Sequence, residues 1–169
     1  MNALALLVLL AGPAAAGPAA ATKAAAQESS FIWLVGASYG APQKLTGGIG
    51  FWVPIVGGDR PLTLMFSGDA QAGMAGAGLR LGLDAWPSPS SNVFLVSVHA
   101  VAAHTWGDPL GTEPGRTLLG GDVEVSLARL LWASAGLLAP VGGSGSTKTV
   151  TTWSVGVRFP IKCFTGCQF

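Results

Sequence analysis

Residues 75–86 read Ala-Gly-Ala-Gly-Leu-Arg-Leu-Gly-Leu-Asp-Ala-Trp, and apolar residues occupy every second position of this stretch. Arg80 and Asp84, its charged residues, share the opposite parity. Successive side chains of a β-strand point to opposite faces. The stretch therefore predicts a strand with one apolar face and one face that holds glycine and charge.

The same alternation recurs along the chain between clusters of Gly, Pro, Ser, Asn and Asp, which are typical of turns. It predicts eight strands, at residues 31–40, 45–55, 62–72, 75–86, 93–106, 117–128, 130–141 and 150–159. Each is close to the length of about 9–11 residues with which a tilted strand crosses a bilayer.

The polar faces of these segments carry the candidate site residues. They are Asp69, Arg80, Asp84, His99, Asp122, Glu124 and Arg158. The predicted strands contain no Lys, whereas a strand face in water usually carries Lys and Glu. The pattern favours an inverted barrel, with apolar residues toward lipid and polar residues in the lumen. Because buried charges must pair, we predict an Arg–carboxylate network there, with the excess carboxylate protonated or paired with His99.

Tryptophan lies near the ends of the predicted strands. The six positions are Trp33, Trp52, Trp86, Trp106, Trp132 and Trp153. Strand ends are where transmembrane barrels carry their girdles of aromatic residues. We therefore expect all six side chains at the membrane interface.

The composition excludes several classes of protein. The 169 residues predict one domain, and 10% of them are charged, where a soluble domain has about 25%. A net charge of +1 without a run of Lys and Arg argues against nucleic acid as a partner. The hydrophobic content of 50% excludes a disordered chain. No motif predicts a cofactor or a metal ion.

Both ends of the chain differ from this pattern. Residues 1–26 combine a short apolar run with a tract of small residues, which predicts a signal peptide; the alternative is an alanine-rich helix. Residues 160–169 form a C-terminal tail with Cys163 and Cys167. Export permits a disulfide between these two cysteines, and free thiols are the alternative.

The segment Thr-Thr-Trp-Ser-Val-Gly-Val-Arg-Phe at 151–159 alternates and ends in Phe. With this closing segment, residues 30–159 resemble the small eight-stranded outer-membrane β-barrels of Gram-negative bacteria, whose last strand carries such an assembly signal. Members of that family usually end at the Phe, whereas residues 160–169 follow here, and the signal could instead use Phe169. The connections 107–116 and 142–149 are long, as outer loops of the family are, and those at 41–44 and near Gly73 are short.

The resemblance implies a closed, antiparallel, up-and-down transmembrane barrel in the outer membrane. Its implied partners are outer-membrane lipid and the barrel-assembly machinery. The implied role is structural, adhesive or partner-docking, without catalysis.

Two other classes of function stay open. A secreted, soluble, lipocalin-like barrel would turn its apolar rows inward and bind an apolar ligand. A lipid-modifying enzyme would use Ser97 and His99, but two residues of one strand face are about 7 Å apart, which exceeds hydrogen-bond reach.

Overall fold

The fold is an all-β barrel of eight strands, seen in a computed structural model that describes residues 31–56, 62–86, 94–128, 130–142 and 148–161. The strands are β1 (Ile32–Ala41), β2 (Lys44–Val56), β3 (Thr63–Gly73), β4 (Gly76–Trp86), β5 (Phe94–Thr105), β6 (Thr117–Leu127), β7 (Leu131–Pro140) and β8 (Val150–Ile161). All eight predicted segments are confirmed. β8 continues past Phe159, the predicted end of the last strand, to Ile161.

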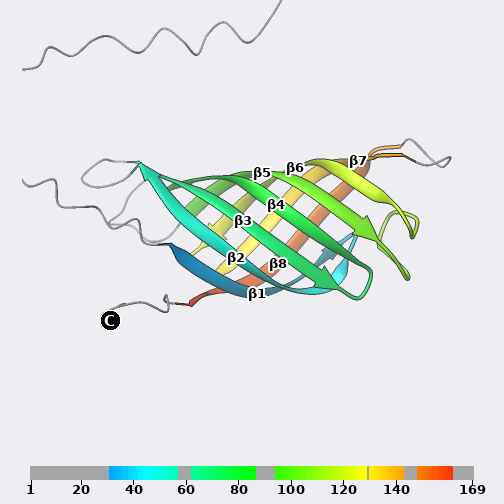
Figure 1. The fold of residues 1–169 in the computed structure, drawn as a ribbon, viewed down its shortest axis with the longest axis horizontal. Coiled ribbons are helices and arrows are strands. Elements are labelled where there is room, and N and C mark those ends of the chain that lie inside the picture. The colour runs from blue at the N-terminus through cyan, green and yellow to red at the C-terminus, as the bar shows by residue number, and fades with distance from the viewer. Residues whose placement is uncertain (1–30, 57–61, 87–93, 129, 143–147, 162–169) are drawn as a thin grey trace, which may run out of the picture.

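Each strand pairs antiparallel with the next along the chain, and β8 pairs with β1 to close the barrel. The closing seam runs from Trp33 opposite Ile161 to Ala41 opposite Trp153. In Figure 1 the strands run obliquely around one common axis. A closed sheet of this kind has no edge strand with unpaired backbone groups.

The barrel has two distinct ends. We call the end that holds the connections β1–β2, β3–β4, β5–β6 and β7–β8 the loop end, and the opposite end, where β1 begins and β8 ends, the terminal end (Figure 1). The first two connections at the loop end contain just residues 42–43 and 74–75. The β5–β6 connection, residues 106–116, is much longer. The short connections expected at 41–44 and near Gly73 are therefore real.

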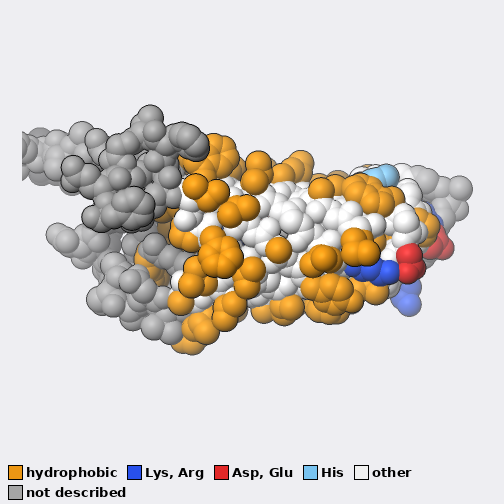
Figure 2. Space-filling view, turned by 90° about the horizontal axis from the view of Figure 1, so that it is seen from below, with side chains coloured by type: hydrophobic (Ala, Val, Ile, Leu, Met, Phe, Trp, Pro, Cys, Tyr) orange, Lys and Arg blue, Asp and Glu red, His pale blue; other side chains and the backbone are white. Residues whose placement is uncertain are grey.

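The two faces of the barrel wall are inverted relative to a soluble barrel. Leu79, Leu81 and Val155 are 58%, 52% and 51% exposed on the exterior, whereas Asp122 and Arg158 are buried in the lumen. On the face seen in Figure 2, hydrophobic side chains cover the wall and charged side chains gather at the loop end. The soluble, lipocalin-like alternative is wrong for this fold, because it needs the apolar rows inside.

Apolar side chains also form a layer across the described lumen near each of its ends. At the terminal end the closing layer consists of Leu34, Trp52, Met65, Trp86 and Leu95, with Ile32 packed against them. At the loop end it consists of Ala103, Leu118 and Leu138, with Val101 and Val150 packed against them. The polar residues of the lumen lie between these two layers.

Half of the tryptophan prediction is wrong. Trp33, Trp106 and Trp153 are between 41% and 44% exposed on the exterior. The side chains that point into the lumen instead are Trp52, Trp86 and Trp132. These three share strand parity with the polar row, and a closed lumen needs bulky side chains to fill it at native packing density.

Several sequence predictions lie outside the described residues. They are the signal peptide and small-residue tract at 1–26, and Cys163 and Cys167 of the C-terminal tail. Within the ranges that the structure describes, no helix is long and apolar enough to cross a membrane.

Candidate functional site

Glu124 stands at the centre of the polar lumen. It lies on β6 with its inward side chain completely buried. Arg158 of β8 donates to both of its carboxylate oxygens, at 2.9 and 3.1 Å, and Arg80 of β4 places Nη1 2.9 Å from Oε2. The Ser126 hydroxyl donates a further hydrogen bond at 2.9 Å. One carboxylate therefore joins two guanidinium groups from different sides of the barrel.

Arg80 extends this network toward two other carboxylates. Its Nη2 lies 3.0 Å from both oxygens of Asp122, and its Nη1 lies 3.6 Å from Asp69. Arg158 lies 4.0 Å from the same oxygen of Asp69. The pairing makes burial of the charges tolerable, because an unpaired charge in a dry interior costs several kcal/mol, on the order of 3–5 when one partner is removed.

Trp132 packs against both guanidinium groups. The distances from its ring to Arg80 and Arg158 are 5.1 and 5.2 Å, within the range of cation–π contacts. Gly156 of β8 makes room for this ring: a Cβ at Gly156 would lie 2.7 Å from Trp132 Cε2. The inward tryptophan thus holds the two arginines in position.

His99 lies between two carboxylates. Its Nδ1 is 2.9 Å from Asp122 Oδ1, and its Nε2 is 3.6 Å from Asp84 Oδ1. The ring lies over Gly82 of β4, where a Cβ would meet His99 Cδ2 at 2.5 Å. Both ring nitrogens therefore face carboxylates, and neither is positioned as a base for Ser97, whose hydroxyl has no hydrogen-bond partner among the described residues.

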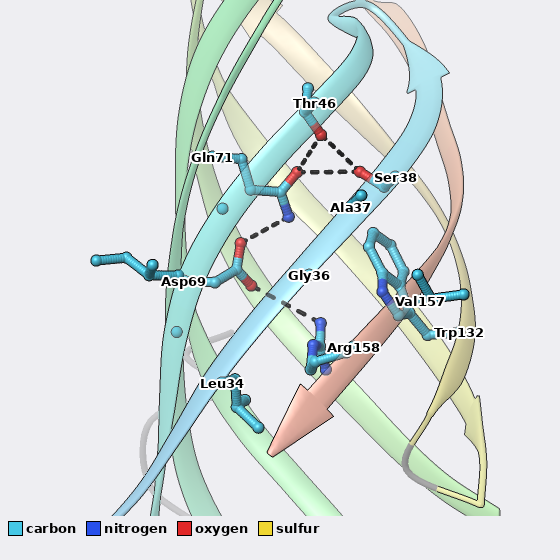
Figure 3. Close-up of a pocket in the computed structure, with 13 residues that line it drawn as sticks. Leu34, Gly36, Ala37, Ser38, Thr46, Asp69, Gln71, Trp132, Val157 and Arg158 are labelled. Carbon is cyan, nitrogen blue, oxygen red and sulfur yellow. Dashed lines mark hydrogen bonds and ion pairs between the residues drawn. The ribbon is translucent and has the colours of Figure 1, made fainter. Parts of the chain in front are cut away.

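A neutral chain of hydrogen bonds continues the network toward the loop end (Figure 3). Gln71 donates to Asp69 at 2.7 Å, and its carbonyl oxygen accepts from Ser38 and Thr46 at 3.3 and 3.2 Å. The hydroxyls of Ser38 and Thr46 are themselves 2.7 Å apart. These side chains come from β1, β2 and β3, so the chain ties the first three strands together inside the barrel.

Two small cavities lie among the described residues of the lumen. One cavity of about 20 Å³ lies among Asp69, Gln71, Trp132 and Arg158 (Figure 3). A second, of about 30 Å³, lies beneath the β1–β2 connection between Gln43 and Arg80. Because one water needs roughly 10–15 Å³ of such volume, the first cavity has room for about one or two waters and the second for about two or three. The lumen is packed between its two apolar layers.

The long β5–β6 connection is fastened to the hairpins beside it. Lys44 donates to Asp108 at 2.6 Å, and the Leu110 amide donates to the Pro42 carbonyl at 2.9 Å. The hydrogen bond from Lys44, and then its charge, lower the pKa of Asp108 below its ordinary value. Within the connection, Arg116 pairs with Glu113. Residues 106–116 therefore have a defined conformation at the loop end.

All seven polar residues singled out in the sequence lie in one connected lumen cluster: Asp69, Arg80, Asp84, His99, Asp122, Glu124 and Arg158. Sequence reasoning missed Thr46 and the inward role of Trp132. The alternation along each strand could have identified both. Thr46 lies on the face opposite the exterior Ile49, and Trp132 lies on the same, inward face as Ser134. In the part of the chain that the structure describes, no three or more His, Cys, Asp or Glu side chains form a group that could hold a metal ion.

Comparison with known proteins adds one likeness. No family model and no curated protein matches the chain. A solved structure of the outer membrane protein Ail of Yersinia pestis, in a phospholipid bilayer nanodisc, is 10% identical with a TM-score of 0.33, over 77% of this chain and 99% of that chain. Because this TM-score is low, the fold is assigned from the strand pairing of this chain and not from the likeness. A closed, eight-stranded antiparallel barrel with an apolar wall and a charged lumen has the architecture of the small outer-membrane barrels.

Proposed function

We propose that this protein is an integral barrel of the bacterial outer membrane that serves as a sealed anchor and presents its loop end to a partner. The observation that carries the proposal is the distribution of charge. Every Asp, Glu and Arg of the eight described strands points into the lumen, and the exterior rows of these strands carry no Asp, Glu, Lys or Arg. Such a wall is stable in hydrocarbon and costly in water.

The packed lumen supports a structural role over transport. The charged cluster lies between two apolar layers, and the cavities within it have room for only a few waters. An ion or solute would have to displace paired charges and packed tryptophan to pass. We therefore expect the barrel to act as a rigid support.

The loop end supports a role in docking or adhesion. Residues 106–116 are held in place by contacts to the β1–β2 hairpin. A hollow of about 420 Å³ lies between this connection and the start of β8, with Glu113, Arg116 and Lys148 on its walls. A polar hollow on a fixed loop suits contact with a protein or a lipid headgroup.

The exposed apolar side chains of β8 are the evidence for a partner in assembly. Trp153, Val155 and Phe159 are 43%, 51% and 53% exposed, and they stand beside β1 at the closing seam. We propose that the barrel-assembly machinery reads this row when it closes the barrel.

Depth-matched substitutions test membrane insertion. Leu81 lies at the middle of β4 and Leu45 at the loop end of β2, and they are 52% and 53% exposed. In phospholipid vesicles, Leu81→Arg should lower the free energy of unfolding by about 2–4 kcal/mol and Leu45→Arg by about 0–1 kcal/mol. Equal, small effects would show that the wall meets water and would overturn the proposal.

Cell fractionation provides the second test. The chain should appear in the outer-membrane fraction, resist extraction by alkaline carbonate, and migrate differently on gels with and without boiling. Recovery in the periplasm or the medium without detergent would contradict membrane insertion.

A further inference from the structure

Among the residues that the structure describes, three buried oxygens of the lumen have no hydrogen-bond partner. They are Ser67 Oγ, Asp84 Oδ2 and Ser97 Oγ, and their residues are 5%, 1% and 1% exposed. A buried polar atom without a partner costs about 1–3 kcal/mol, and more when it is charged. Three such atoms in one place call for an explanation.

The strand register brings the three side chains together. Asp84 of β4 faces Ser97 directly across the β4–β5 pair. Ser67 of β3 pairs with Gly82 and is therefore the diagonal neighbour of Asp84. Directly opposed residues have Cβ atoms about 4.5–5.5 Å apart, and diagonal neighbours are about 7–8 Å apart. All three side chains point into the lumen from the consecutive strands β3, β4 and β5, so they lie on one part of its wall.

The charges of the described lumen do not balance at this point. Four carboxylates, those of Asp69, Asp84, Asp122 and Glu124, face two guanidinium groups and one imidazole. Even with a charged His99, one negative charge is left over. Asp84 is the carboxylate whose second oxygen has no partner, so the excess charge lies beside the two unpartnered hydroxyls.

We propose that Asp84, Ser67 and Ser97 bind one small monovalent cation, of the size of sodium, inside the barrel. Carboxylate and hydroxyl oxygens are ligands that hard cations prefer. Sodium has nearly the radius of calcium, whose oxygen ligands lie at roughly 2.3–2.6 Å. Oxygens that surround such an ion are too far apart to hydrogen-bond one another, which would explain why these three have no partner. With a charged His99, one positive charge completes the balance, whereas a divalent ion would overshoot it and would need more carboxylates.

The test uses the folded barrel in phosphatidylcholine vesicles, with sodium chloride exchanged for choline chloride at constant ionic strength. Choline is too large for the packed lumen. Sodium that binds only the folded state should lower the unfolding equilibrium constant about tenfold for each tenfold rise in sodium above half-saturation. A stability that is equal in the two salts overturns the proposal and leaves a water or a proton at Asp84.

Variants locate the site. Asp84→Asn and Ser97→Ala should abolish or strongly weaken the sodium dependence. Ser134→Ala is the matched control, because Ser134 is an equally inward, buried serine that bonds Ser154 at 2.8 Å; it should keep the full dependence. If Asp84→Asn does not fold, Ser67→Ala and Ser97→Ala decide. Sodium dependence that survives in both serine variants contradicts this site, whereas insertion in the membrane is tested separately by Leu81→Arg.

Discussion

Replacing Glu124 by Gln tests whether the lumen network stabilises the barrel. The change keeps the shape of the side chain and removes the charge that faces Arg158 at 2.9 and 3.1 Å and Arg80 at 2.9 Å. Removing one partner of a buried ion pair costs about 3–5 kcal/mol. Asp69 and Asp122 still face the guanidinium groups, so we expect the lower end of that range, about 3 kcal/mol.

The assay is urea unfolding in phospholipid vesicles, followed by tryptophan fluorescence and by the gel shift of the folded barrel. Glu113→Gln is the matched control, because Glu113 also pairs with an arginine but its side chain is 66% exposed. A surface pair is worth less than about 1 kcal/mol. If Glu124→Gln is as stable as Glu113→Gln, the central carboxylate does not hold the two arginines, and the reasoning about the lumen fails.

Three further predictions concern the tight packing at Gly82, the pH dependence of the Lys44–Asp108 contact and the conductance of the barrel. Gly82→Ala should destabilise the barrel by about 1–3 kcal/mol, because its Cβ would clash with the Val98 carbonyl oxygen and would lie 2.5 Å from the His99 ring. Gly47→Ala, where the closest atom is 4.0 Å from the new Cβ, should be near neutral in the same urea assay. The docking of residues 106–116 should persist above the ordinary pKa of Asp108, 3.8, and be lost as the pH falls through its lowered value; faster amide exchange at Leu110 reports this, and Asp108→Asn should show it at neutral pH. In planar bilayers the wild-type barrel should show no steady conductance, and stable open channels would contradict a sealed lumen.

The positions of the strands, and which face of each strand points to lipid, could be predicted because one physical cause sets both. Lipid outside and a packed lumen inside impose an alternation that a single strand such as 76–86 already displays. The tryptophans were harder, because a strand end says nothing about which face a residue takes. To place Trp52 and Trp132 correctly, the inward face that they share with their neighbours has to count for more than their nearness to a strand end.

The pairing inside the lumen could not be predicted from the sequence. Glu124 and Arg158 belong to β6 and β8, which are not adjacent. Which inward residues meet across a barrel depends on the stagger accumulated over all of its strands, and alternation carries no information about that stagger. The sequence therefore shows which charges share the lumen, and the three-dimensional register decides their partners.

The bidentate partner of Glu124 comes from β8, the last described strand of the barrel in chain order. Before β8 takes its place between β7 and β1, a partly assembled sheet has Arg80 beside Glu124 but not Arg158, so the central carboxylate lacks one of its two arginine partners. Addition of β8 therefore also completes the charge pairing at Glu124. Arg158 therefore stabilises the closed barrel relative to a chain in which β8 is not yet in place.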